Sequence, residues 1–234
     1  MINCILPRCL FPPAITTAFG RVALCVALLA GVPTGNAQTN DQPADPVPEF
    51  QPLFDGQSLA GWKIADFGGR DDVEVRDGEI VVGMGYPLAG IIFDGDPPAV
   101  DNYVLELSAC KREGTDFFCC VTFPVRDQSC SFVLGGWGGT VTGISSVNGE
   151  LASDNATRTL RRYERDRWYH VRITVQGNQL VCHIDDEQVV DLDLQDVELT
   201  VHPALEHCQP FSICAFETRA SWKDIRIARI EGEE

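Results

Sequence analysis

Over long stretches of the chain, apolar and polar residues alternate one by one, which is the pattern of a β-strand with one buried face. In residues 103–110, Tyr, Leu, Leu and Ala alternate with Val, Glu, Ser and Cys, and the same period recurs in residues 169–176. Asp-Gly at 77–78 and Gly-Asn at 177–178 supply turns of the kind that join antiparallel strands. Strands are predicted at 73–75, 80–82, 103–110, 117–123, 130–134, 169–176, 180–184, 189–192, 211–216 and 222–230.

This set of short strands predicts an all-β protein. A helical period is scarcely present, and its nearest candidates lie in the loops near Asp196 and Pro203. About ten strands that alternate one face in and one face out pack as two antiparallel sheets, which is a β-sandwich. Such a sandwich buries a sizeable core, so we expect it to need neither a metal ion nor a disulfide for its stability.

The N-terminal segment has the layout of an export signal. Residues 1–37 contain two bases and no acid, with an apolar run of 11 residues from Val22 to Val32 and small residues at Gly35 and Ala37. A membrane anchor is the alternative, but a spanning helix needs about 20 apolar residues. We therefore predict a signal peptide at 1–37, cleaved near Ala37, a proline-containing linker at 38–49 and one domain at 50–232. The mature protein is expected to be secreted or periplasmic, with no integral membrane segment.

The charge of the chain excludes one class of partner. Lys and Arg number 18 against 34 Asp and Glu, which gives a formal net charge of −16. Loss of the two bases in the predicted signal peptide would make the exported chain more acidic still. Because attraction to phosphate requires an excess of Lys and Arg, we expect no nucleic acid partner.

Cysteine use is ambiguous. Of the ten cysteines, Cys4, Cys9 and Cys25 fall in the predicted signal peptide, which leaves an odd number in the exported part. The spacing of Cys119, Cys120 and Cys130 suggests a disulfide, or a metal site together with Cys110. A hairpin that turns at 126–127, however, places position 120 opposite position 133, too far offset from 130 for a disulfide. For most of these cysteines we predict buried thiols that pack as small apolar side chains.

Three segments carry a family pattern. Leu-Phe-Asp-Gly-Gln-Ser-Leu-Ala-Gly-Trp at 53–62 resembles the opening signature of the 3-keto-disaccharide hydrolase domain family. Trp168, Gly177 and Ile-Asp-Asp at 184–186 resemble its penultimate strands, and Ser-Trp-Lys-Asp-Ile-Arg-Ile at 221–227 resembles its closing strand. The resemblance spans the whole domain. It implies a concanavalin-like jelly roll and a saccharide ligand, with hydrolysis or elimination at glycosides that are oxidised at carbon 3.

The middle of the chain departs from that family. Gly-Thr-Asp-Phe at 114–117, Cys-Ser-Phe-Val at 130–133 and Cys-Ala-Phe at 214–216 stand where the family carries Gly-Asn-Ser-Gly, Glu-x-Gln and Gln-x-His. Most of the expected polar side chains are thus Cys, Phe or Val. Because proton abstraction beside a ketone needs a base and a group that stabilises an enolate, either the site has moved or this branch has kept the scaffold and lost the reaction.

Candidate catalytic residues come from predicted strand ends and turns. Asp116 is our first candidate, because it places an ionisable group at a polar position of the family, and Glu217 and Arg219 follow. A pair of carboxylates at about 5 to 9.5 Å would be the ordinary glycosidase arrangement. The alternative for each residue is a solvated turn in an acidic protein.

Candidate binding residues lie in two segments. Trp137 is flanked by two glycines on each side, and such a backbone lets a ligand approach the indole face, as sugar stacking requires. Asp154, Asn155 and Arg158 lie in a loop that could approach the candidate catalytic residues. The alternative for Trp137 is packing on the rim of the sandwich.

Other clusters have ordinary explanations. Five arginines within 158–167 could bind an acidic sugar, although an exposed loop and edge strand explain them as well. His202, Glu206, His207 and Cys208 have metal-ligating side chains at a spacing that fits no standard zinc motif, so we predict no metal site. No nucleophile elbow, zinc-protease motif or dinucleotide fingerprint occurs, and the residues identify no cofactor.

The sequence therefore leaves three functions open. The first is a carbohydrate-active enzyme that hydrolyses or eliminates 3-keto-glycosides, as the resemblance implies. The second is a carbohydrate-binding module without catalysis, which would hold a glycan through Trp137. The third is an interaction domain of a cell-surface assembly.

Overall fold

The computed structural model of the chain describes residues 48–68 and 73–231. The predicted signal peptide and nearly all of the predicted linker lie outside the described residues. Within the described residues, no helix is long and apolar enough to span a membrane.

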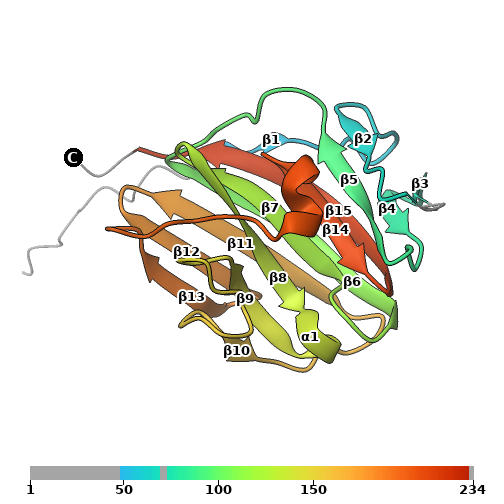
Figure 1. Cartoon of the computed structure of the whole chain (residues 1–234). Coiled ribbons are helices and arrows are strands. Elements are labelled where there is room, and N and C mark those ends of the chain that lie inside the picture. Colours follow the sequence, from blue (N-terminus) through green and yellow to red (C-terminus); the bar gives the residue numbers. More distant parts are fainter. Residues whose placement is uncertain (1–47, 69–72, 232–234) are drawn as a thin grey trace, which may run out of the picture. The chain divides into compact units, whose positions relative to one another are not determined.

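Two antiparallel sheets form the described part of the chain, as the alternation predicts (Figure 1). The eight-stranded sheet has the order β13-β12-β11-β6-β15-β4-β3, with β1 paired to β15. Its strands are β1 (Gln51–Pro52), β3 (Val73–Arg76), β4 (Glu79–Val82), β6 (Tyr103–Gly114), β11 (Trp168–Gln176), β12 (Gln179–Ile184), β13 (Glu187–Asp193) and β15 (Thr218–Arg229).

The seven-stranded sheet has the order β10-β9-β8-β7-β14-β5-β2. Its strands are β2 (Trp62–Ile64), β5 (Leu88–Phe93), β7 (Cys119–Val125), β8 (Gln128–Gly135), β9 (Val141–Ser145), β10 (Thr159–Leu160) and β14 (Ser212–Phe216). Two short helical segments accompany it, α1 (Gly136–Gly139) after β8 and the 3-10 helix η1 (Pro203–Cys208) before β14. Figure 1 shows η1 lying over this sheet, in front of β7 and β14.

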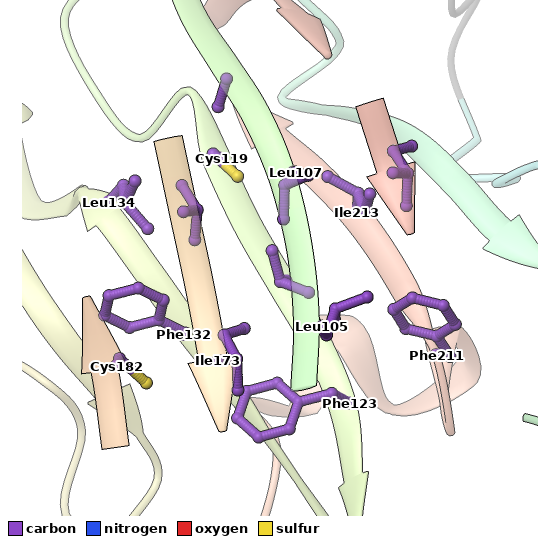
Figure 2. Packing of buried hydrophobic residues seen from close by; sticks show 14 of the residues in the cluster. Leu105, Leu107, Cys119, Phe123, Phe132, Leu134, Ile173, Cys182, Phe211 and Ile213 are labelled. Carbon is purple, nitrogen blue, oxygen red and sulfur yellow. The ribbon is translucent and has the colours of Figure 1, made fainter. Parts of the chain in front are cut away.

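The core lies between the two sheets. In Figure 2, Leu105 and Leu107 of β6 and Ile173 of β11 face Phe123 of β7 and Phe132 of β8. All five side chains are buried, and at about 25 cal/mol for each Å² of apolar surface this layer supplies the main favourable term of folding. Two buried hydrogen bonds also link the sheets. The Trp222 indole N–H on β15 donates to the carbonyl of Phe118, just before β7, at 2.9 Å, and the Tyr103 hydroxyl on β6 donates to the Pro124 carbonyl on β7 at 2.7 Å.

The predicted hairpin register is confirmed. Cys120 lies opposite Val133, and Cys130 lies opposite Phe123, so Cys120 and Cys130 point to opposite faces of the sheet. The seven cysteines of the described residues are all buried free thiols, as predicted for most of them. Of the two loops that came nearest to a helical period, the one near Pro203 contains the short 3-10 helix η1, whereas Asp196 has a φ of 58° in a turn.

The segment that resembles the family's opening signature has a folding role. The Asp55 carboxylate accepts hydrogen bonds from the backbone N–H of Gln57 and Ser58 and from the Ser58 hydroxyl, and these bonds, Gln57 first, lower the pKa of Asp55. The Trp62 indole N–H donates to the Leu53 carbonyl at 2.7 Å. The segment thus closes a loop and places Trp62 in the core. Its residues therefore have a structural role and do not indicate a catalytic one.

A buried carboxylate ties three strands together on the outer face of the eight-stranded sheet. Glu106 of β6 lies in register with Arg172 of β11 and Arg226 of β15, and it accepts from them at 2.7 Å and 2.6 Å. The Glu106 side chain is only 1% exposed. Burial would raise the pKa of Glu106, but the hydrogen bonds from Arg226 and Arg172 outweigh it, and the pKa of Glu106 is lowered.

We expect Glu106→Gln to destabilise the fold in a pH-dependent way. Because the folded-state pKa of Glu106 lies below its unfolded value near 4.5, the carboxylate contributes stability above that pH and loses it as the pH falls through the folded value. At neutral pH the free energy of unfolding should drop by about 1.5–3 kcal/mol, and the difference from wild type should shrink in acid. Urea unfolding at several pH values measures it. Glu113→Gln, whose carboxylate is exposed and 3.7 Å from Arg219, is the control and should change stability by less than about 0.5 kcal/mol. An equal loss at all pH values would contradict this account.

Candidate functional site

A cavity of about 370 Å³ lies on the outer face of the seven-stranded sheet, at the side covered by η1. Strand residues form its floor, and α1, the loop after β9 and η1 form its walls. The lining consists of Leu88, Asp116, Phe117, Cys120, Ser131, Val133, Trp137, Ser145, Leu151, His202, Ala204, Leu205 and Phe216. Most of these side chains are apolar, and a few polar groups converge among them, which is the usual composition of a small-molecule site.

A row of hydroxyl groups crosses the outer face of this sheet. Ser212, Thr122, Ser131 and Ser145 lie opposite one another in turn on β14, β7, β8 and β9. Thr122 and Ser131 share a hydrogen bond of 2.9 Å. The buried Ser145 hydroxyl, which lines the cavity, has no hydrogen-bond partner among the residues that the structure describes. Because buried hydroxyls are nearly always paired, Ser145 is a group that a polar ligand could satisfy.

Asp116 and Trp137 meet in the cavity because Asp116 holds the turn that carries Trp137. Trp137 and Gly138 have φ values of 50° and 86°, a conformation that glycine adopts easily and tryptophan rarely. The Asp116 carboxylate stabilises this turn by accepting the Gly138 N–H at 2.9 Å, while its other oxygen accepts the Phe117 N–H at 2.8 Å. Trp137 remains 43% exposed at the cavity.

The backbone of Asp116 is held by hydrogen bonds to Thr218 and Lys111. Its N–H donates to the Thr218 hydroxyl at 3.1 Å, and that hydroxyl donates to the Asp116 carbonyl at 3.0 Å. The Lys111 ammonium donates to the same carbonyl at 3.3 Å, and burial lowers the pKa of Lys111. Each carboxylate oxygen of Asp116 accepts one N–H and keeps a further lone pair, so the group is oriented and can still accept a proton.

His202 adds a second acid–base group to the lining. It is the N-cap residue that precedes η1, and its Nδ1 accepts the Ala204 N–H at 3.1 Å. In neutral imidazole one nitrogen accepts and the other donates, so this bond leaves the proton on Nε2. His202 therefore contributes a hydrogen-bond donor to the lining of the cavity, whereas the Asp116 carboxylate contributes an acceptor.

The other predicted site residues do not line the cavity. Glu217 is exposed beyond β14, and Arg219 is 3.7 Å from Glu113 on the neighbouring strand. In the loop after β9, Asp154 accepts a hydrogen bond from Ser153, and Arg158 is exposed.

Asn155 is occupied within its own loop. Its amide nitrogen donates to the carbonyls of Ile144 and Glu150, and its amide oxygen accepts from the N–H and the hydroxyl of Thr157. This side chain is 5% exposed and shapes the loop that supplies Leu151 to the cavity wall.

Several positions that depart from the family pattern line the cavity, whereas Cys130 lies in the core. Asp116, Ser131, Val133 and Phe216 all line the cavity, and Cys214 packs in the same outer cluster. Ser131 and Ser145 were missed from sequence because a serine at an alternating strand position is common. The sequence indicates His202 only as a possible metal ligand. Because His202 and Asp116 are far apart in the chain, no sequence pattern shows that they line the same cavity.

The arginine cluster at 158–167 includes side chains that form ion pairs within the fold. Arg161 pairs with Glu187 at 2.5 Å, and Arg167 pairs with Asp185 at 2.9 Å, which ties the segment before β11 to the β12–β13 hairpin. Within the described residues, no three His, Cys, Asp or Glu side chains are placed to hold one metal ion.

The fold defines a class, the concanavalin-like jelly rolls. A galectin-like protein of unknown function from Bacillus subtilis superposes with a TM-score of 0.55 at 9% identity, over 79% of this chain and 96% of that one. A proposed glycosyl hydrolase from Parabacteroides distasonis gives a TM-score of 0.50 at 13% identity, over 78% and 94%. The Crh5 transglycosylase gives 0.50 at 12%, over 80% and 84%. At these identities the likeness shows the fold.

The family follows from the sequence profile. The 3-keto-alpha-glucoside-1,2-lyase-like domain matches residues 49–228, and the chain belongs to that family. It is thus a carbohydrate-related β-sandwich. Among curated proteins, no relative matches.

We expect Asp116→Ala to loosen the Trp137 turn. The change removes the acceptors of the Gly138 and Phe117 N–H groups, so the Gly138 amide should exchange about tenfold faster and the free energy of unfolding should drop by about 1–2 kcal/mol. Hydrogen exchange of the 135–140 segment measures it. Asp127→Ala changes an exposed aspartate in the β7–β8 turn and should leave that exchange unchanged. Equal exchange in both variants would show that Asp116 does not hold the turn.

Proposed function

We propose that the protein binds a 3-keto-glycoside in the Asp116–Trp137 cavity and cleaves its glycosidic bond by elimination. The observation that carries the proposal is the convergence of Asp116, Trp137 and His202 on one cavity in a chain of the 3-keto-alpha-glucoside-1,2-lyase-like family. A sugar ring presents an apolar C–H face and a rim of hydroxyl groups. The indole of Trp137 suits the first, and the hydroxyls of Ser131 and Ser145 suit the second.

The chemistry requires one base and one proton donor. A ketone at carbon 3 acidifies the C–H at carbon 2, because the electron pair left there delocalises into an enolate. When a base takes that proton, the pair forms the C1–C2 double bond and expels the glycosidic oxygen from carbon 1, and that oxygen takes up a proton as it leaves. Addition of water to the double bond would complete a net hydrolysis.

The cavity contains a residue for each role. Asp116 is the base, because hydrogen bonds to Phe117 and Gly138 fix its carboxylate and leave lone pairs free. His202 is the donor, because its Nδ1 is occupied by Ala204 and its Nε2 carries the proton. An Nε2–H directed at the ketone or at the departing oxygen would stabilise the negative charge that develops there.

The place of action proposed here is outside the cytoplasm. The predicted signal peptide at 1–37 supports it, and so does the linker composition at 38–49. A chain exported in this way would meet glycosides before they are taken up.

A binding module without catalysis is the second candidate, and one observation favours it. The positions where the family resemblance implies polar side chains are Val133, Phe216 and Cys214 here, so the cavity floor is largely apolar. A site of this kind can hold a ligand through Trp137 and the serine hydroxyls with no proton transfer.

An assay with a chromogenic pair of substrates separates the two candidates. We expect the protein to release nitrophenol from nitrophenyl 3-keto-glucoside and not from the parent glucoside. Asp116→Asn should lower that rate by at least about 100-fold, because a positioned base contributes 10²–10⁴-fold. Glu113→Gln, an exposed carboxylate on β6 outside the cavity, is the control and should keep the rate. Release that survives Asp116→Asn would refute the assigned base.

Ligand binding is measured separately by thermal shift and calorimetry. Trp137→Ala should weaken binding of the 3-keto-glucoside by about 2- to 12-fold, because loss of an aromatic stacking partner costs about 0.5–1.5 kcal/mol. A thermal shift with no turnover would support the binding module. No shift and no turnover would reject both candidates.

A further inference from the structure

Three thiols meet beneath η1, beside the cavity. Cys120 of β7, Cys208 of η1 and Cys214 of β14 pack in one buried cluster, and each is at most 1% exposed. The other thiols lie elsewhere. Cys119, Cys130 and Cys182 belong to the core between the sheets, as Figure 2 shows for Cys119 and Cys182, and Cys110 lies in the eight-stranded sheet.

Cys214 is the centre of this cluster. Across the sheet it lies in register with Cys120 on one side and with Gly90 of β5 on the other. A Cβ atom at Gly90 would come within 2.7 Å of the Cys214 sulfur, so glycine leaves the space that this sulfur occupies. From above, η1 brings Cys208 onto it.

Cys208 and Cys214 interact within this buried cluster. The interaction lowers the pKa of Cys208, because it stabilises the Cys208 thiolate, and together with burial it raises the pKa of Cys214. Cys208 is therefore the member of the pair with more thiolate character, which is the nucleophilic form.

We propose that Cys208 and Cys214 are a thiol–disulfide pair whose oxidation fastens η1 to β14. The proposal rests on the thiol cluster alone and is independent of the saccharide proposal. Only six positions separate the two residues in the chain, so the disulfide closes a small loop and acts on the placement of η1.

The oxidant is a low-molecular-weight disulfide. The Cys208 thiolate attacks one of its sulfur atoms, which forms a mixed disulfide and releases one small thiolate. The Cys214 thiolate then attacks the Cys208 sulfur, which forms the Cys208–Cys214 bond and releases the second small thiolate. The pair loses two protons and two electrons, and the small disulfide gains them. Because both thiols are buried, the first attack requires η1 to lift from the sheet.

Oxidation would act on the cavity through η1. His202, Ala204 and Leu205, which line the cavity, belong to η1 or cap it, and Cys208 is its last residue. The reduced form can lift this wall, whereas the disulfide holds it against β14. The pair thus makes cavity access depend on the redox state of the surroundings.

The test uses the purified protein incubated with oxidised or reduced glutathione. After oxidation we expect intact mass to fall by two hydrogens and peptide mapping to find Cys208 linked to Cys214. Amide exchange in residues 204–208 should slow by about tenfold in the oxidised form and recover with a reducing agent. A protein that keeps all its thiols under these conditions, or one whose bond joins other cysteines, would overturn the proposal.

Matched variants locate the bond and separate it from a folding defect. Cys208→Ala should abolish both the cross-link and the change in exchange, while Cys120→Ala, which removes the third thiol of the cluster, should keep both. Circular dichroism of each reduced variant reports whether it is folded. A cross-link that survives Cys208→Ala or disappears in Cys120→Ala would assign the bond to Cys120 and Cys214 and refute the pair proposed here.

Discussion

The alternation of side chains along the strands of the seven-stranded sheet is the constraint on which the rest of the structure depends. Because successive side chains of a strand point to opposite faces, every residue that fills the core dictates which neighbours form the outer face. On β8, burial of Phe132 and Leu134 turns Ser131 and Val133 outward. On β7, burial of Cys119 likewise turns Cys120 outward. The cavity floor and the thiol cluster are therefore consequences of the same register that builds the core.

The cavity walls depend on long-range contacts. Asp116 precedes β7 and accepts the N–H of Gly138 in α1, and Thr218 at the start of β15 fixes the backbone of Asp116 from behind. One aspartate thus supports the Trp137 turn and supplies the carboxylate of the cavity. Because of this double role, the Asp116 side chain is held by the fold and still has lone pairs available to a ligand.

Much of the fold could be predicted because its determinants are local. The turn at Asp77-Gly78, the alternation in 103–110 and the offset between Cys120 and Cys130 each follow from neighbouring residues, and the structure agrees with all three. The site was harder, because its groups are far apart in the chain. Asp116 and His202 meet only when β7 and η1 come together, and no local pattern marks a serine such as Ser145 as unpaired.

By itself, the sequence determined the antiparallel sandwich, the faces of its strands and the family resemblance. The alternation of apolar and polar residues, the turn residues and the family motifs at both ends of the domain are all local patterns that can be seen in neighbouring positions. The tertiary structure decided which of the candidate residues share a cavity. Asp116 and Trp137 line the same cavity, whereas Glu217 and Arg219 lie outside it. The side chain of Asn155 is hydrogen-bonded within its own loop, and Cys208 packs with Cys214 in one cluster. The physical reason is that these contacts depend on strand pairing and on the position of η1 against the sheet, which no local sequence pattern specifies.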